Sequence, residues 1–364
     1  MIELSAPSLV EWLLTGRCNL RCIHCSTWRS GDVPDGLSTP EALALADRVA
    51  ELKVFNVILS GGEPFLRDDL AEVCGRLAGQ GVNVLIPTNG GLVTPAAARR
   101  VVAAGPRMVQ VSVDGQNAAT HDHIRGVAGS FEAALAAIAT LQDAGMPGVG
   151  ISTTISAKNV EELPAIVDLA LRLRVRSLNL RLCLPCGRAR QEYAALALAP
   201  ERYRRVLVDF VRWRDELRDR LELASVEPLL ALIDADLAQA ESDFSGDEFS
   251  GCGAGKTACC VWPDGTVSPC SYNDQAAGNV RQQDLGEIWR TSAVFRTYRD
   301  FATLVRGACT ACDYKRVCAG GCKSRSWGTY GTVSRPDPMC WLASDPPPGP
   351  AEPPGPPPAT PRGT

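Results

Sequence analysis

The stretch Cys18-Asn19-Leu20-Arg21-Cys22-Ile23-His24-Cys25 places three thiols within eight residues, after an apolar run that begins at Leu9. A structural zinc site is closed by four ligands, and His24 is poorly placed to be the fourth because it adjoins Cys25 and competes for the same corner. Three thiolates leave one position of a metal centre open. A [4Fe–4S] cluster held by three cysteines has one iron free for another molecule, so the spacing favours such a centre.

Apolar runs and amphipathic segments alternate from this stretch onward. The apolar runs predict six buried strands, at residues 9–14, 54–59, 82–86, 108–113, 149–155 and 175–182. The amphipathic segments predict helices between them, at residues 40–52, 69–78, 95–104, 131–144 and 163–173. Strand and helix in repeated order build parallel βα units, and six fall short of the eight strands of a full barrel. We therefore expect an α/β fold with a partial (β/α)6 TIM-like barrel, open on one side to a large substrate.

Composition divides the rest of the chain into further segments. We expect the barrel with trailing helical patterns at 201–223 and 228–240 to occupy residues 1–240, and a polar linker to follow at 241–250. A small cysteine-rich domain is predicted at 251–342. Prolines crowd residues 343–364, which predicts a disordered tail of polyproline type.

Overall composition narrows the class of function. The 364 residues are 45% hydrophobic and carry a net charge of −4, so the chain can bury a large core and has no basic field for nucleic acid. No apolar run reaches membrane-spanning length, and the N-terminus does not resemble a signal peptide. We expect a cytoplasmic protein without nucleic-acid or membrane partners. There, fifteen cysteines indicate metal ligands or catalytic thiols rather than disulfides.

Polar residues and glycines gather where the predicted strands end. They follow or close each of the six strands in turn: Cys18 to Cys25, Gly61-Gly62-Glu63, Thr88-Asn89, Ser112 with Asp114, Thr153-Thr154, and Cys183. In barrel enzymes the carboxyl ends of the strands carry the chemistry, because their loops converge on one mouth. Such residues also simply terminate strands. Six consecutive occurrences favour an active site.

Cys18-x3-Cys22-x2-Cys25, followed by Gly61-Gly62-Glu63 after the second strand, resembles the radical S-adenosylmethionine (SAM) superfamily. The resemblance implies a [4Fe–4S] cluster on the three cysteines, whose free iron takes the amino and carboxylate groups of SAM. It further implies that the Gly61-Gly62-Glu63 loop holds the SAM amino group.

The same resemblance assigns further SAM contacts. It makes Ser112, Asp114 and Arg125 candidates for the ribose and carboxylate of SAM, and places His24 near the adenine. A guanidinium can bind a carboxylate bidentately, which suits Arg125 to this role. Arg125 can also be read as a surface residue in a loop before a helix.

The last third of the chain holds a second cysteine pattern. It runs Cys252, Gly265, Cys270, then Cys309-x2-Cys312-x5-Cys318-x3-Cys322, and ends with Cys340. This resembles the SPASM extension of radical SAM enzymes, which carries two auxiliary iron–sulfur clusters. The resemblance implies one cluster on Cys309, Cys312, Cys318 and Cys340, and another on Cys252, Cys270 and Cys322. A pair of zinc ribbons is the alternative, but it leaves odd cysteines without partners.

The fourth ligand of the Cys252 cluster stays open between Cys259, Cys260 and a position left free for substrate. Residues 261–270 contain the turn Pro263-Asp264-Gly265 and predict a hairpin that returns Cys270 to the first ligands.

The resemblance implies a 5′-deoxyadenosyl radical that abstracts hydrogen from an unactivated carbon, with electrons from a donor such as flavodoxin or ferredoxin. The substrate radical then loses an electron to an auxiliary cluster, giving dehydrogenation or a crosslink, or regains hydrogen from a thiol, giving an epimer. Cys183 and Cys186, at the end of the sixth strand, are candidate hydrogen donors, with packing at the strand end as the alternative role.

Three functions remain open on the sequence alone. The first is maturation of a ribosomal peptide or peptide-derived cofactor, with a separate peptide-recognition protein as a further candidate partner. The second is an epimerase or dehydrogenase that tailors a sugar or other small metabolite in natural-product biosynthesis. The third is a non-catalytic zinc-binding scaffold.

Overall fold

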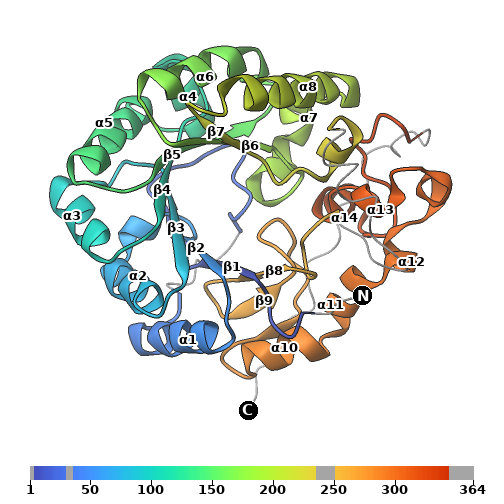
Figure 1. The fold of residues 1–364 in the computed structure, drawn as a ribbon, viewed down its shortest axis with the longest axis horizontal. Coiled ribbons are helices and arrows are strands. Elements are labelled where there is room, and N and C mark those ends of the chain that lie inside the picture. Colours follow the sequence, from blue (N-terminus) through green and yellow to red (C-terminus); the bar gives the residue numbers. More distant parts are fainter. Residues whose placement is uncertain (1–3, 30–35, 235–250, 344–364) are drawn as a thin grey trace.

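A computed structural model describes residues 4–29, 36–234 and 251–343. One curved ten-stranded sheet lies at the centre, with its strands in the order β10-β9-β8-β1-β2-β3-β4-β5-β6-β7. Helices α1 to α6 and α8 lie around the outside of the curve, α10 and α11 continue this ring at the bottom of the view, and α12 to α14 lie at its right (Figure 1). The strands are β1 Leu9–Leu13, β2 Asn56–Ser60, β3 Asn83–Thr88, β4 Met108–Ser112, β5 Val149–Ile155, β6 Ser177–Leu182, β7 Glu222–Ala224, β8 Ala258–Val261, β9 Thr266–Ser268 and β10 Gly278–Asn279.

Helices connect the strands and build the C-terminal region. The α-helices are α1 Thr39–Glu51, α2 Leu70–Ala78, α3 Pro95–Ala103, α4 Ala118–Arg125, α5 Ser130–Asp143, α6 Leu163–Arg172, α7 Tyr193–Leu196, α8 Pro200–Leu217, α10 Leu285–Thr291, α11 Ala293–Arg299, α12 Phe301–Leu304, α13 Lys315–Cys318 and α14 Lys323–Tyr330. Short 3-10 helices lie at η1 Pro64–Leu66, η2 Val160–Glu162, η3 Gly187–Glu192, η4 Pro228–Leu232 and η5 Gly307–Ala311.

The predicted α/β class is confirmed, because β1 to β6 are parallel and joined by helices. Among the elements that were not predicted, two belong to the barrel. A seventh strand, β7, pairs in parallel with β6 at the end of the segment predicted as one long helix. Helix α4 precedes α5, in a stretch read as a loop. The helical pattern predicted at 228–240 begins as η4, and its residues from 235, together with the proposed linker and most of the tail, lie outside the described residues.

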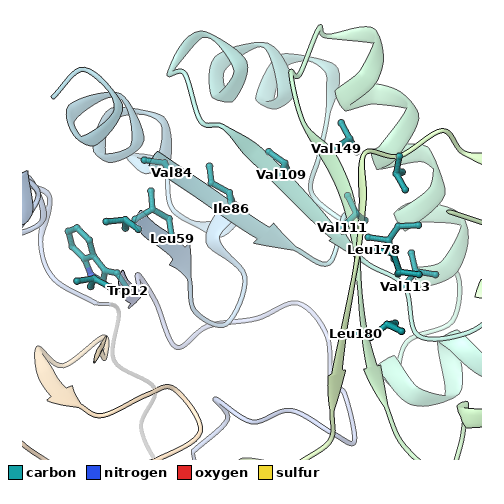
Figure 2. Packing of buried hydrophobic residues seen from close by; sticks show 14 of the residues in the cluster. Trp12, Leu59, Val84, Ile86, Val109, Val111, Val113, Val149, Leu178 and Leu180 are labelled. Atoms are coloured by element: carbon teal, nitrogen blue, oxygen red, sulfur yellow. The ribbon is translucent and has the colours of Figure 1, made fainter. Parts of the chain in front are cut away.

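The main core lies between the sheet and the helices around it. Alternate strand residues point outward into it, including Trp12, Leu59, Ile86 and Val109, all at most 1% exposed (Figure 2). The other face of each strand points into the lumen of the curved sheet. This alternation follows from the two-residue period of a strand, and it places both polar and apolar side chains along the lumen. In the described part of the chain no single helix is long and apolar enough to span a membrane, and α4 with α5 pass only as a pair bent by 100°.

The cysteine-rich region extends the barrel sheet. Strand β8 pairs in parallel with β1, in the register Leu9↔Ala258 to Trp12↔Val261. Strands β8 and β9 are antiparallel, so the hairpin predicted over residues 261–270 is confirmed, with Gly265 at φ 85° in its turn. The hairpin carries Cys270 to the lumen side of the molecule, where it borders a cavity.

Candidate functional site

The loop after β1 brings Cys18, Cys22 and Cys25 to the wall of a cavity of about 170 Å³ at the carboxyl ends of the strands. The Cys22 sulfur accepts a hydrogen bond from Arg125 Nη1 at 3.7 Å, and the Cys18 sulfur accepts one from Asn89 Nδ2 at 3.8 Å. Burial raises the pKa of Cys18 to about 11 and also raises that of Cys22. Such thiols become thiolates when a metal binds them, which fits a metal centre here.

The loop after β2 is shaped by two glycines. A side chain at Gly62 would meet the Arg17 carbonyl oxygen at 2.0 Å, and Gly61 has φ +141°. This close approach places Glu63 against the same cavity with 1% of its surface exposed. Its carboxylate accepts hydrogen bonds from Thr88 Oγ1 at 2.7 Å and the Asn89 N–H at 2.8 Å. Burial raises the pKa of Glu63, so a bound cation would stabilise its charged form.

Asp114 organises the opposite charges of the site. Its Oδ2 lies 2.7 Å from both His24 Nε2 and Arg125 Nη2, and its Oδ1 accepts the Thr154 N–H at 2.8 Å. Burial works to raise the pKa of Asp114, but Arg125 and then His24 outweigh it and hold the pKa well below its usual range. Asp114 is fully buried and thus orients its two partners rather than facing the cavity itself.

Arg125 is the last residue of α4, whose first turn is capped by the Asn117 side chain. It is 8% exposed, so the reading of this residue as a surface loop arginine is wrong. Gly126, with φ 73°, ends the helix and directs the side chain inward. Arg125 Nε is buried without a hydrogen-bond partner among the described residues. A buried donor without an acceptor is unfavourable, and a carboxylate such as that of SAM could accept a hydrogen bond from it.

The structure thus gathers most of the SAM-site residues predicted from sequence around one cavity. Its wall contains Cys18, Cys22, His24, Cys25, Gly61, Gly62, Glu63, Ser112 and Arg125. The buried Glu63 carboxylate, the buried Arg125 guanidinium with its unpaired Nε, and three thiols therefore line the same cavity. Their chemistry fits a zwitterionic amino acid group beside an iron–sulfur cluster.

A second group of thiols borders a larger cavity of about 460 Å³. Cys252, Cys270 and Cys322 all line it, and Cys270 Sγ lies 2.9 Å from Ser324 Oγ. Burial, with the neighbouring Cys252, raises the pKa of Cys270 to about 12. Three thiols, from the segment before β8, from just after β9 and from the N-cap of α14, thus line one cavity.

Cys259 and Cys260 lie on opposite faces of β8. Cys259 shares a face with Val10 and packs in the main core, although it also borders the larger cavity. Cys260 shares a face with Glu11 and packs with Leu13 and Trp262. Cys259, Cys260 and a position left free for substrate all remain candidates for the fourth ligand of the Cys252 cluster.

A third group of thiols surrounds η5 and α13. It consists of Cys309, Cys312, Cys318 and Cys340. Burial is the main cause that raises the pKa values of Cys309, to about 11, of Cys318 and of Cys340, and neighbouring thiols of the group add to it. Lys323 is fully buried and donates to the carbonyl oxygens of Leu304 at 3.0 Å and Gly320 at 3.2 Å. Burial lowers its pKa, against which Cys252 of the second group and Cys309 and Cys318 of the third act to raise it. A buried cation between two groups of thiols offsets the negative charge that metal-bound thiolates bring.

Cys183 and Cys186 are buried but border neither of the two cavities. Cys183 packs with Ala189 and Leu196. Burial is the main cause that raises the pKa of Cys183, to about 12. The hydrogen-donor role of the two thiols remains a prediction without support from the cavity geometry.

The two cavities meet at residues that the sequence analysis did not single out. Glu11, Ile58, Arg181 and Tyr272 line both. The available signal for Arg181 was a charged residue within the mostly buried strand Ser177–Leu182.

The partial barrel has three thiols, a glycine loop and a buried carboxylate and guanidinium at its mouth, which is the arrangement expected of an enzyme that binds a metal centre and a small charged cofactor. The sequence agrees with this class. Residues 12–170 match the radical SAM superfamily, and residues 252–313 match the iron–sulfur cluster-binding SPASM domain.

Relatives cover nearly the whole chain. The AdoMet-dependent heme synthase of Methanosarcina barkeri is 37% identical over 92% of this chain and 97% of that protein. The mycofactocin maturase MftC of Mycobacterium tuberculosis is 32% identical over 93% of this chain and 83% of that protein.

The fold matches Streptococcus suis SuiB bound to S-adenosylmethionine, with a TM-score of 0.76 and 17% identity over 93% of this chain and 78% of that one. A SuiB structure bound to precursor peptide SuiA matches with a TM-score of 0.74 and 16% identity over 93% and 77% of the two chains.

The chain belongs to the radical SAM superfamily and carries a SPASM domain. It is a radical SAM enzyme, whose cofactors are SAM, a [4Fe–4S] cluster and auxiliary iron–sulfur clusters. This assignment replaces the zinc-scaffold alternative.

Proposed function

We propose that this enzyme oxidises a substrate at an unactivated carbon in the barrel lumen, and that the substrate is a peptide segment that inserts one residue. Cys18, Cys22 and Cys25 hold the SAM-binding cluster. Glu63 binds the SAM amino group, Arg125 its carboxylate, and Asp114 with His24 keeps Arg125 in place. When bound, SAM and the cluster supply the radical chemistry that removes hydrogen from carbon.

One observation carries the oxidation: the two cavities share four lining residues, so the SAM site and the Cys252, Cys270 and Cys322 group face one lumen. A substrate carbon near the first group is thus close to residues suited to an electron-accepting cluster. Loss of a hydrogen atom, then of an electron and a proton, would give a two-electron oxidation and a product two hydrogens lighter. Return of hydrogen from Cys183 or Cys186 is less favoured, because neither thiol borders the lumen cavities.

The charges of the lumen favour a substrate with few anionic groups. The larger cavity is lined mainly by apolar side chains, with Glu11 and Glu227 as its acids. Its arginines are Arg181 and Arg325, and Arg325 is already paired with two carboxylates. One side chain or terminus of a peptide suits such a space. SuiB, which shares the fold, is known with a precursor peptide bound.

A tetrapyrrole is the second candidate substrate. The 37% identity to a heme synthase supports it. A tetrapyrrole carries several propionate groups, and among the described residues of this lumen most arginines are already paired with carboxylates. We therefore rank the tetrapyrrole after the peptide. Sugars remain a third class that no observation here favours.

The proposal is tested with anaerobically reconstituted enzyme, SAM and a reductant. Short peptides encoded beside the gene and an iron porphyrin with propionate side chains are compared for their stimulation of 5′-deoxyadenosine release. Peptide-dependent release with a product two hydrogens lighter is expected. Porphyrin-dependent release would overturn the peptide assignment, and a product of unchanged mass would overturn the oxidation.

The matched control is a variant that lacks only the three thiols of the SAM-binding cluster. Cys18→Ala, Cys22→Ala and Cys25→Ala together should abolish SAM cleavage, yet most of the iron should remain because the other thiol groups are untouched. Cleavage that persists in this variant would contradict the cluster assignment.

A further inference from the structure

Arg181 stands where the two cavities meet. It lies near the end of β6, paired in register with Thr154 of β5, and its side chain lines both cavities. The rest of β6 is apolar except for Ser177 and Asn179. A guanidinium is always charged in a protein, so this strand holds a permanent positive charge inside the lumen.

The hydrogen bonds of Arg181 are incomplete. Its Nε is buried without a partner among the described residues. Its one hydrogen bond there runs from Nη1 to the Tyr272 hydroxyl, at a long 3.4 Å. A buried donor without an acceptor lowers the stability of the free protein. A bound ligand that accepts a hydrogen bond from Nε would remove this loss of stability.

The other arginines that line these cavities are already paired with carboxylates. Arg125 is 2.7 Å from Asp114, and Arg325 lies 2.6 Å from both Glu227 and Asp337. Within the described part of the chain Arg181 forms no ion pair. Glu11 lines the same two cavities, and Tyr272 and then the Glu11 charge raise the pKa of Arg181. Glu11 is nevertheless not ion-paired with Arg181 among the described residues, and its carboxylate accepts the Ser271 hydroxyl at 2.6 Å.

We infer that Arg181 is the binding site for one carboxylate group of the substrate, held where the two cavities meet. The planar guanidinium presents Nε and an Nη in the fork that a carboxylate matches, and Nε is the atom left without a partner. The inference rests on the proposed function and adds a substrate feature to it: the inserted residue carries a side-chain or terminal carboxylate. A neutral peptide carbonyl would satisfy the donor without using the charge.

Binding of two blocked amino acids separates these cases. N-acetyl-phenylalanine and its C-terminal amide have the same shape and differ in the carboxylate. Their dissociation constants are measured by isothermal titration on the SAM-loaded, reconstituted holoenzyme, wild type and Arg181→Met. The carboxylate should bind the wild type about tenfold more tightly than the amide, or better, and the preference should disappear in Arg181→Met.

Two further variants serve as controls. Arg181→Lys keeps a point charge without the fork, so it should retain part of the preference. Arg176→Met, at an exposed arginine just before β6, should leave the preference unchanged. Equal binding of the two probes by the wild type, or a preference that survives Arg181→Met, would overturn the inference.

Thermal unfolding and SAM binding exclude the remaining roles. If the free guanidinium awaits a ligand, Arg181→Met should raise the midpoint of unfolding of the probe-free holoenzyme. A lower midpoint with an unchanged probe preference would make Arg181 structural. A loss of SAM affinity in Arg181→Met would assign the guanidinium to SAM and likewise overturn the inference. None of these measurements depends on turnover of a peptide. The inference about Arg181 can therefore be contradicted while the proposed function stands, and the reverse.

Discussion

Glu63 and Arg125 are buried charges of opposite sign on the wall of the smaller cavity. Each keeps part of its bonding capacity unused: Glu63 Oε2 accepts only the Asn89 N–H, and Arg125 Nε has no partner among the described residues. A buried charge needs a partner of opposite charge to be stable. The ammonium and carboxylate groups of an amino acid could supply both partners. The pair therefore matches the ends of one zwitterion.

Replacement of Glu63 by Gln removes the negative charge and keeps the shape. If Glu63 binds the SAM ammonium, the affinity for SAM should fall by about 1.5–3 kcal/mol, the usual contribution of a hydrogen bond to a charged group. Equilibrium dialysis with the reconstituted protein measures this. Glu72→Gln, on the exposed face of α2, is the matched control and should bind SAM as the wild type does. Equal affinities for Glu63→Gln and the control would leave Glu63 with a structural role only.

Single residues were predictable where a motif fixed them. Cys18, Glu63 and Arg125 were found because their spacing resembles a family, and the structure brings them to one cavity. Arg181 and Lys323 were missed, because their roles depend on what faces them across the lumen or between two groups of thiols. No local pattern encodes such a pairing. The only local signal was a charge within a buried segment.

At the scale of elements, α14 joins the cysteine-rich region to the barrel side of the molecule through Arg325. The guanidinium is fully buried and binds Glu227 bidentately, at 2.7 and 2.6 Å, and Asp337 at 2.6 Å. Glu227 also accepts the hydroxyl of Tyr203 on α8, at 2.8 Å. Asp337 in turn accepts the N–H of Cys322, at 2.6 Å. The network thus fixes a proposed cluster ligand relative to α8.

Arg325→Met should be strongly destabilising, because it leaves two carboxylates buried without their cation. Breaking a buried ion pair typically costs about 3–5 kcal/mol. Urea unfolding of the holoenzyme, followed by circular dichroism, measures the change. Arg296→Met on the exposed side of α11 is the control, with an expected effect within about 0.5 kcal/mol.

The pH dependence of this effect has a definite sign. Burial works to raise the pKa of Glu227, but Arg325 outweighs it and holds the pKa below its ordinary value of 4.5. A carboxylate with a lowered pKa stabilises the fold above its unfolded pKa and loses this effect as the pH falls through the folded one. Wild type and Arg325→Met should therefore converge below pH 4.5. An equal difference at acid and neutral pH would contradict the network.

Elements were predictable where they were long and periodic. The predicted strand 149–155 coincides with β5, and the predicted helix 163–173 ends one residue beyond α6. Strand β7 has three residues, too few to show an alternation, and its place is fixed by pairing with β6. Helix α4 is polar, so periodicity did not reveal it, although Asn117 at its start and Gly126 at its end are typical helix boundaries.

At the scale of the whole molecule, the two expected domains share one sheet. Strand β8 pairs with β1 over four residue pairs, and Trp289 of α10 donates its indole N–H to the Leu4 carbonyl at 2.7 Å. Leu285, Ile288 and Phe295 belong to the same core cluster as Val10 and Trp12. The family matches to residues 12–170 and 252–313 mark separate sequence units, yet the packing between them is that of one core.

A chain that ends after residue 234 should therefore fail to fold as a monomer. Its β1 strand would become an open edge with unpaired N–H and C=O groups, and the core around Val10 and Trp12 would lose the cover of α10 and α11. Exposed edges and apolar surface lead to association, so size-exclusion chromatography should show aggregates. Removal of residues 345–364 alone is the matched control. It should leave the elution volume and the circular dichroism unchanged, because the proline-rich sequence of these residues predicts no packed structure. A truncated barrel that elutes as a folded monomer and still binds SAM would show that the sheet shared by β1 and β8 is not needed for the barrel to fold.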